Sequence, residues 1–223
     1  STCAVRADHT LWCWGMNRDG QLGTGTRTEF EPEPKQVGIN DDWQSVSIGL
    51  RSACGIRTYG GIRRVHCWGG DDSGQTGLGN PQGSGPVLIP TRIPMLDGAL
   101  EVRVASVHAI AITEDRGLAC WGANFSSQCG LDPVANVSLR SPVLVSEASR
   151  VRMASAGGSI TCYGTAEAGG RTLWCMGEGP IGNVTNGWRG VTTTPVRVGL
   201  ADEWSDGLSV SQSAHVLAVS GLH

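Results

Sequence analysis

Aromatic residues other than tryptophan are scarce in this chain, and its net charge is small. Phenylalanine and tyrosine occur twice each, against eight tryptophans. The formal net charge is −3 and the pI is about 5.9, which argues against a nucleic-acid partner because nucleic-acid-binding surfaces are usually basic. No apolar run reaches the roughly 18 residues of a membrane-spanning helix. The composition therefore predicts neither a nucleic-acid partner nor a membrane span.

Motifs for catalysis and for metal binding are also missing. No cysteines or histidines have the close Cys-x2–4-Cys or His-x3-His spacing of a zinc site, and no acidic run alternates as in a calcium loop. A Gly-x-Ser-x-Gly nucleophile motif is absent, and the glycine-rich stretch 74–79 lacks the lysine of a phosphate loop. The sequence thus predicts a protein that is not an enzyme and that holds no metal or cofactor.

A four-fold repeat is present instead. Cys13-Trp14-Gly15 returns as Cys67-Trp68-Gly69, then as Cys120-Trp121-Gly122, and in altered form as Cys175-Met176-Gly177. The intervals between these cysteines are 54, 53 and 55 residues. A fixed period of this size is typical of repeat architectures.

Each repeat contains short apolar stretches separated by turn residues, which predicts four short strands. The second repeat is the most complete, with expected strands at 43–49, 53–56, 64–68 and 87–93. Prolines in the last strand of each repeat favour a sheet edge. We predict an all-β β-propeller of four-stranded antiparallel blades, with a β-sandwich as the alternative. The expected repeats cover residues 1–40, 41–98, 99–147, 148–200 and, in part, 201–223.

The stretch Trp14–Gly25, read as Trp-Gly-Met-Asn-Arg-Asp-Gly-Gln-Leu-Gly-Thr-Gly, resembles the regulator of chromosome condensation repeat. The fourth repeat departs from that pattern, since Met176 stands in place of tryptophan and the following turn is shorter. The resemblance implies a propeller, and that family typically has seven blades. We therefore expect this chain, with no initiator methionine and no signal peptide, to be a processed chain or a piece of a larger ring.

The functions known in that family are diverse. They include guanine-nucleotide exchange on the Ran GTPase with nucleosome binding, light sensing through tryptophans, extracellular domains of plant receptor kinases, and a secreted bacterial β-lactamase inhibitor. Fold resemblance does not choose among them.

The eight cysteines fall into a pattern when the repeats are aligned. Facing residues on antiparallel strands come within disulfide reach, so one cysteine on each of two neighbouring strands predicts a bridge within the repeat. In the third repeat Ile110 takes the place of the first cysteine, and an extra cysteine appears at 129. The expected bridges are Cys3–Cys13, Cys54–Cys67, Cys120–Cys129 and Cys162–Cys175. Reduced thiols in a cytosolic protein are the alternative.

Disulfides point to an oxidising compartment and hence to a secreted, extracellular protein. Three glycosylation tripeptides, at Asn124, Asn136 and Asn183, fit the same location if the source is a eukaryote.

Candidate contact residues lie where the repeat pattern is interrupted. Arg57, Arg63 and Arg64 form the one basic cluster, on an expected hairpin loop at 57–63. Trp188 and Arg189 lie off the repeat pattern, and aromatic and arginine side chains are common at binding hot spots. A solvated loop tip, or a loop packed back on the ring, is the alternative. His108 and His215 share a repeat position and are interpreted as structural residues that bond a neighbouring loop.

These observations predict a non-enzymatic extracellular module for protein–protein interaction or structural assembly. Its partner would be another protein or the remainder of its own propeller. A secreted protein inhibitor of an enzyme and a guanine-nucleotide exchange factor-like propeller are the alternatives.

Overall fold

A computed structural model describes residues 1–167, 170–180, 189–199, 204–210 and 216–220 of the chain. The described residues form five consecutive antiparallel sheets, each built from strands that follow one another in sequence. Three of these sheets have four strands, and they correspond to the second, third and fourth expected repeats. The all-β propeller-type fold predicted from the sequence is confirmed.

The strand bounds follow the sequence expectation closely. The first sheet holds β1 (Thr2–Val5), β2 (Leu11–Met16) and β3 (Phe30–Gln36). The second holds β4 (Trp43–Ile48), β5 (Ser52–Tyr59), β6 (Ile62–Gly69) and β7 (Val87–Arg92), followed by the short 3-10 helix η1 (Pro94–Leu96). The third holds β8 (Glu101–Val104), β9 (His108–Ile112), β10 (Leu118–Ala123) and β11 (Ser138–Leu144).

The last two sheets complete the described chain. The fourth consists of β12 (Val151–Gly157), β13 (Ile160–Glu167), β14 (Gly170–Pro180) and β15 (Arg189–Val198). The fifth pairs β16 (Trp204–Val210) with β17 (Val216–Ser220). No helix in the described part of the chain has the length and hydropathy needed to cross a bilayer.

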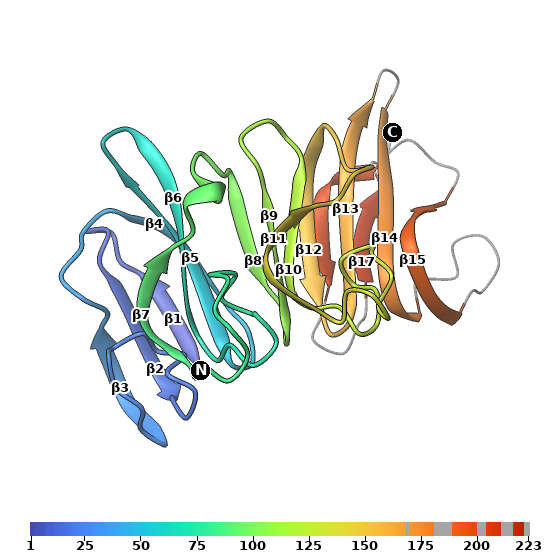
Figure 1. Ribbon diagram of the computed structural model, residues 1–223. Coiled ribbons are helices and arrows are strands. Elements are labelled where there is room, and N and C mark those ends of the chain that lie inside the picture. The colour runs from blue at the N-terminus through green and yellow to red at the C-terminus, as the bar shows by residue number, and fades with distance from the viewer. Residues whose placement is uncertain (168–169, 181–188, 200–203, 211–215, 221–223) are drawn as a thin grey trace.

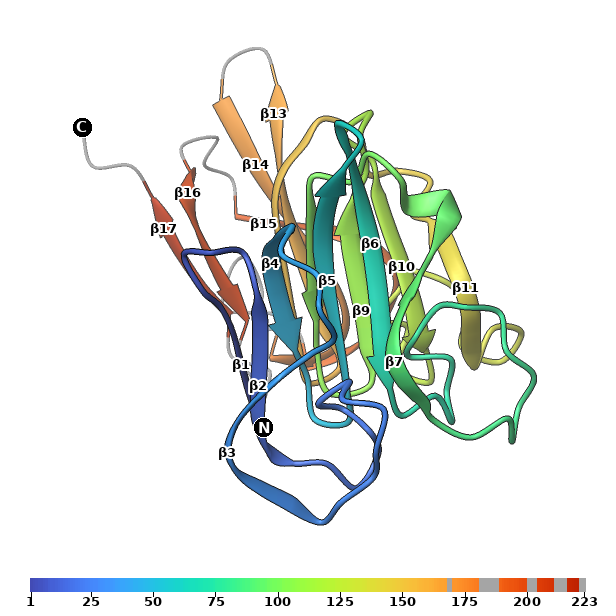
Figure 2. The same cartoon turned by 90° about the vertical axis from the view of Figure 1, so that its left-hand side faces the viewer.

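The first four sheets stand side by side in chain order, and the fifth lies behind the fourth in this view (Figure 1). Each packs against the next, with contacts between β1 and β4, β5 and β8, β9 and β12, and β12 and β16. Figure 2 shows that the β5–β6 and β13–β14 hairpins project from one end of the stack, which we call the hairpin face. The long connections that follow β2 and β6 lie at the opposite end, the turn face.

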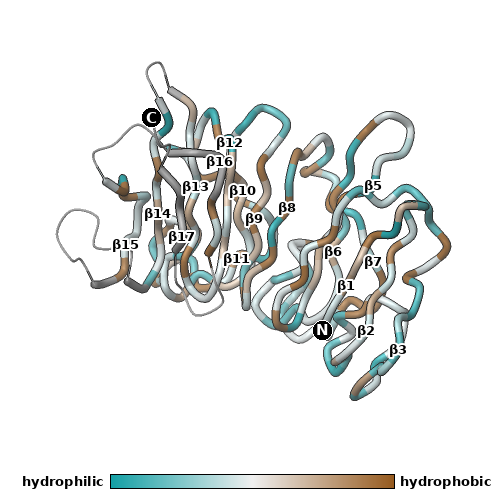
Figure 3. Tube along the Cα trace, turned by 180° about the vertical axis from the view of Figure 1, so that it is seen from behind, coloured by the Kyte–Doolittle hydropathy of each residue, from teal (hydrophilic) through white to brown (hydrophobic). Residues whose placement is uncertain are grey.

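The core lies between neighbouring sheets rather than within one central layer. Figure 3 shows hydrophobic residues along most strands. One cluster joins the first and second sheets, and its members come from both. Strands that pack on both faces must be apolar on both sides, which accounts for the all-buried β9 and β10. The cluster between the first two sheets consists of Leu11, Cys13, Leu22, Val37, Trp43, Ala53 and Trp68.

The hairpin between β5 and β6 differs from the expected loop at 57–63. Arg57 faces Arg64 and Tyr59 faces Ile62 across the ladder, so the strands run on to a two-residue turn. Gly60 and Gly61 form that turn with φ of 60° and 73°, and paired positive φ values suit a tight hairpin turn. The loop prediction was wrong because two glycines let the strands pair almost to the tip.

Candidate functional site

Four disulfides join the cysteines in the pairs expected from the sequence. Cys3–Cys13, Cys54–Cys67 and Cys162–Cys175 each link two facing residues of one sheet, with Cα atoms 4.1 Å apart. Cys120 is instead bonded to Cys129, with a Cα separation of 5.5 Å, and Ile110 faces Cys120 on β9. None of the eight cysteines is free. Three bridges therefore lie within a sheet, the fourth joins β10 to the turn that follows it, and none joins two sheets.

Removal of one bridge should destabilise the protein measurably. We expect the double variant Cys162→Ala and Cys175→Ala to lose about 3 kcal/mol of unfolding free energy, the chain-entropy value for a loop of this size. Urea denaturation followed by circular dichroism would measure the loss. An unchanged midpoint in the double variant would show that the bridge contributes nothing.

In the second and third sheets the repeated tryptophan connects the sheet to the one before it. The indole N–H of Trp68 donates to the backbone carbonyl of Gln21 at 2.9 Å, and that of Trp121 donates to Gln75 at 3.0 Å. Both indole side chains are fully buried. The contact requires a glycine, since a Cβ at Gly23 would lie 2.7 Å from Nε1 of Trp68. The tryptophan thus fills the space between blades.

Two polar side chains stabilise the turn that follows the second strand of the first sheet, and the turns after β6 and β10 have equivalent pairs. In the first sheet the Asn17 Oδ1 accepts the backbone N–H of Leu22, and the Gln21 Oε1 accepts that of Asp19. Both side chains are buried. Sequence reasoning missed these roles, although the recurrence of Asn or Asp four residues before Gln was a signal. The equivalent pairs are Asp71 with Gln75 and Asn124 with Gln128.

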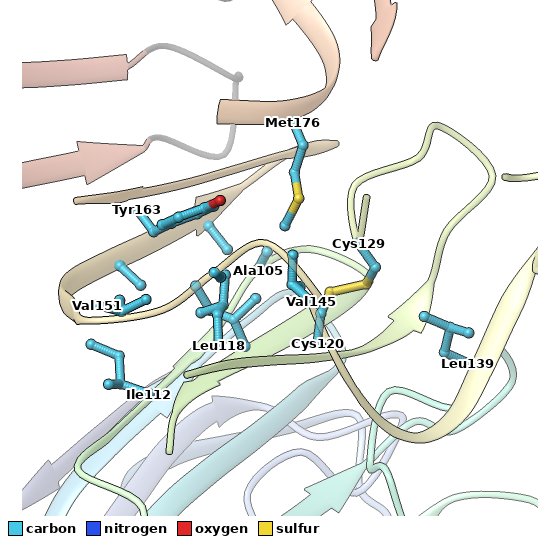
Figure 4. Packing of buried hydrophobic residues seen from close by; sticks show 14 residues of the cluster. Ala105, Ile112, Leu118, Cys120, Cys129, Leu139, Val145, Val151, Tyr163 and Met176 are labelled. Carbon is cyan, nitrogen blue, oxygen red and sulfur yellow. A yellow bond between two sulfur atoms is a disulfide. The ribbon is translucent and has the colours of Figure 1, made fainter. Parts of the chain in front are cut away.

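At the interface between the third and fourth sheets, Met176 takes the place of the tryptophan. Figure 4 shows Met176 extending from β14 toward Val145 and the Cys120–Cys129 bridge. A Cβ at Gly130 would lie 2.8 Å from the Met176 sulfur, so the glycine keeps its role while methionine replaces tryptophan. Met176 and both cysteines belong to one buried cluster. A flexible thioether suits such an irregular gap.

Asn124, one of the candidate glycosylation residues, is buried in the folded chain. Its side chain is completely buried, and Nδ2 donates to the carbonyl oxygens of Leu131 and Asn136 at 3.1 and 2.9 Å. A glycan on that nitrogen would break both hydrogen bonds and displace the turn. Asn136 is partly exposed, and Asn183 lies outside the described residues.

Peptide mapping can separate the two described sequons. After expression in a eukaryotic secretory system, we expect the folded, secreted chain to carry no glycan at Asn124, whereas Asn136 is accessible to one. Mass spectrometry before and after glycosidase treatment would locate the sugars, and an Asn136→Gln variant is the control. A folded product that is fully glycosylated at Asn124 would contradict the turn geometry.

His108 connects two sheets. It is buried, and Nε2 lies 2.9 Å from the Thr161 hydroxyl on β13, so its neighbour is a strand rather than the expected loop. Nδ1 is also buried and has no hydrogen-bond partner in the described part of the chain. Burial lowers the pKa of His108 to about 4, so the ring is neutral at neutral pH. His215 lies outside the described residues.

Two of the three arginines of the basic cluster are paired inside the protein. Arg57 makes a two-pronged ion pair with Asp42 at 2.6 and 2.9 Å, and its side chain is only 17% exposed. The Arg64 guanidinium stacks over the Tyr59 ring at 3.9 Å and lies 3.9 Å from the Asp97 carboxylate. Neither is a free charge at a loop tip, because the Arg57 side chain is paired with Asp42 and the Arg64 side chain, 14% exposed, packs on Tyr59.

Arg63 remains available, and it lines a cavity on the hairpin face. The cavity has a volume of about 770 Å³ and lies between the second and third sheets. The side chains of Arg63 and Glu114 both lie next to Gly98. Arg63 donates a hydrogen bond to the Gly98 carbonyl oxygen at 3.3 Å, and a Cβ at Gly98 would lie 2.5 Å from the Glu114 carboxylate. Both are exposed, and neither forms an ion pair with any residue that the structure describes. The remaining lining residues are Gln44, Thr58, Gly61, Ile62 and Asp97.

The other candidate contacts are not placed in this site. Trp188 lies outside the described residues, and Arg189 marks the start of β15. The described residues contain no group of three or more histidine, cysteine, aspartate or glutamate side chains placed to hold a metal ion.

Known proteins contain the same kind of repeat as this chain. The family model for the regulator of chromosome condensation (RCC1) repeat matches residues 8–56 and 119–163. Each match runs from the β-hairpin that carries one Cys-Trp-Gly segment into the next sheet. The structure of yeast RCC1 (Prp20) bound to Kap60 superposes with a TM-score of 0.77 over 98% of this chain, at 17% identity. Two stretches of the chain thus match the RCC1 repeat, and its fold is similar to that of RCC1-type β-propellers.

Relatives with RCC1-like repeats are longer than this chain. The ultraviolet-B receptor UVR8 of Arabidopsis thaliana is 29% identical over 197 residues, which is 87% of this chain and 43% of the receptor. The mouse secretion-regulating guanine nucleotide exchange factor is 28% identical over 170 residues, 64% of this chain and 36% of its own length. The chain also spans 51% of the yeast RCC1 chain. It thus corresponds to about half or less of these proteins.

Proposed function

We propose that this chain is a non-enzymatic extracellular module that binds another protein through its hairpin face. The observation that carries the proposal is the cavity between the second and third sheets, where Arg63 and Glu114 present opposite unpaired charges. Ile62, 44% exposed, adds an apolar contact at the same place. Exposed charges of both signs beside an apolar side chain suit a protein partner better than a nucleic acid.

Site-specific crosslinking would test this surface. A photo-reactive amino acid at Ile62 should capture a specific protein from the extracellular fluid of the source. The same amino acid at Gln82, an exposed residue of the connection between β6 and β7, should not capture it. The affinity of the identified partner should then fall at least ten-fold with Glu114→Lys. Capture at both positions alike, or an unchanged affinity, would refute the hairpin face as the contact.

The extracellular location rests on the cysteines. Four disulfides with no free thiol suit an oxidising compartment. Protein isolated from its source under alkylating conditions should therefore carry no label on any of the eight cysteines. Labelling of most of them would place the protein in a reducing compartment.

An intracellular exchange-factor role is the second candidate, because the mouse relative is named as a guanine nucleotide exchange factor. It predicts accelerated release of a fluorescent guanine nucleotide from a small GTPase. A secreted inhibitor of an enzyme is the third, and a hydrolase captured at Ile62 and blocked by the chain would favour it.

A further inference from the structure

The cavity on the hairpin face is bounded by two neighbouring hairpins of different length. In the second sheet, five residue pairs separate the Cys54–Cys67 bridge from the turn of the hairpin. In the third sheet, only two pairs lie between the facing residues Ile110 and Cys120 and the turn at residues 113–117. The β5–β6 hairpin is thus three pairs longer, which is about 10 Å of strand. It forms a wall beside the shorter turn.

Two opposite charges line this cavity without an ion-pair partner among the described residues. Arg63 belongs to the wall and Glu114 to the turn, and both side chains are exposed. Asp97, the third charged lining residue, is already paired, because the Arg92 Nε donates to its carboxylate at 3.0 Å. The cavity therefore offers a partner one cation and one anion, each from a different element.

A second, smaller cavity adjoins the same turn. It has a volume of about 210 Å³ and is lined by Asp115, the residue that follows Glu114. Its apolar lining includes Leu144, which is 63% exposed at the end of β11. Arg116, the cation of this turn, lines neither cavity. Because consecutive residues line the two cavities, one extended segment can cross the turn and reach both.

The turn presents carboxylates to such a segment. The Thr113 hydroxyl and, more weakly, the Gly117 N–H donate to the Asp115 carboxylate, and these hydrogen bonds lower its pKa. Asp115 is exposed, as is Glu114 beside it. A basic side chain lying over the turn would therefore meet two negative charges, whereas a phosphate group would be repelled by both.

We propose that the hairpin face recognises an internal loop of a protein partner in which an acidic, a basic and an aliphatic residue follow one another across the turn. The acidic side chain pairs with Arg63. The basic side chain lies between Glu114 and Asp115, and the aliphatic one enters the cavity beside Leu144. Complementary charges of this kind fix the register of a bound segment. The proposal rests on the function proposed above for the hairpin face and names the chemistry of its partner.

A random-peptide library displayed inside a loop of a carrier protein tests the proposal, since neither peptide end is free. Selection on the immobilised protein should enrich loops with an acidic, a basic and an aliphatic residue in this order, in one chain direction or the other. Glu114→Gln and Arg63→Gln should each weaken binding of these loops about ten-fold, and Leu144→Ser should weaken it as well. Glu33→Gln, at an exposed position of β3, is the matched control and should leave binding unchanged.

A charge reversal separates recognition from a structural role of the arginine. The Arg63→Glu variant should reject the selected loops and bind versions in which their acidic residue is replaced by lysine, which the parent protein rejects. A folded variant without this reversed preference would overturn the proposal.

The outcome of the selection is independent of the crosslinking experiment. If Ile62 captures a partner but the enriched loops lack this order of charges, or no loop is enriched, the proposal is overturned and the hairpin face remains the contact surface. Failure of capture at Ile62 refutes the proposed function instead, so the two failures are distinguishable.

Discussion

Replacement of Trp121 by alanine is expected to lower the free energy of unfolding by about 4 kcal/mol, within the range for buried tryptophan truncations. The side chain is fully buried in the cluster between the second and third sheets. Its indole N–H also satisfies the backbone carbonyl of Gln75. Truncation removes the packing and leaves that oxygen without its donor. Urea denaturation monitored by far-ultraviolet circular dichroism would measure the change.

Trp14 provides the matched control for this prediction. It occupies the same register position, but it is partly exposed and its indole N–H has no described partner. Trp14→Ala should therefore cost only about 1 kcal/mol, a usual value for a partly exposed position. Equal losses for the two variants would contradict the view that the preceding turn makes the tryptophan important. Trp121→Phe, which keeps an aromatic ring and removes the donor, should fall between them.

Acidification is expected to destabilise the protein by about 3 kcal/mol between pH 7 and pH 4 through His108 alone, at roughly 1.4 kcal/mol per pKa unit. Burial holds the pKa of His108 at about 4, against 6.5 for a solvent-exposed histidine. Between these values the unfolded chain binds the proton and the folded chain does not, so stability falls as the pH falls. The contribution of the neutral ring is complete above about pH 6.5. Denaturation midpoints measured across this range would show the loss.

His108→Gln keeps a hydrogen-bonding group near Thr161 and removes the titration, so its stability should depend less on pH over this range. Some dependence should remain, because burial also lowers the pKa of His66. A variant with the same acid sensitivity as the wild-type protein would assign the effect to other groups.

The cysteine pairing was predictable because it depends on local geometry. Cys3 and Cys13 belong to neighbouring strands of one hairpin, and the repeat alignment defines their register. The exception at Cys120 was also readable, because one cysteine was lost and another gained within a single repeat. Short-range pairing of this kind needs no knowledge of how the sheets pack.

The partners of the basic cluster could not be found in this way. Arg57 pairs with Asp42, and Arg64 lies near Asp97, a residue beyond the end of β7. These contacts depend on where the ends of β4 and η1 lie once the sheets are assembled. A run of arginines is therefore visible in sequence, but whether its charge is neutralised is decided by tertiary structure.

Asn124 shows a different limit. The glycosylation tripeptide is read from three residues and contains no information about burial. The repeat contained the missing information, since Asn17 and Asp71 occupy the same position and accept the same backbone hydrogen bond. Comparison of the repeats would have assigned Asn124 to the turn.

The absence of disulfides between neighbouring sheets has a mechanical consequence. When a force pulls on the two ends of the chain, neighbouring sheets can separate while every bridge stays intact. The residues enclosed by each bridge cannot extend, which shortens the chain released from each bridged sheet by up to about 3.6 Å per enclosed residue. Under tension the protein would thus lengthen in steps, one sheet at a time, and reducing agents would lengthen the steps of the four bridged sheets.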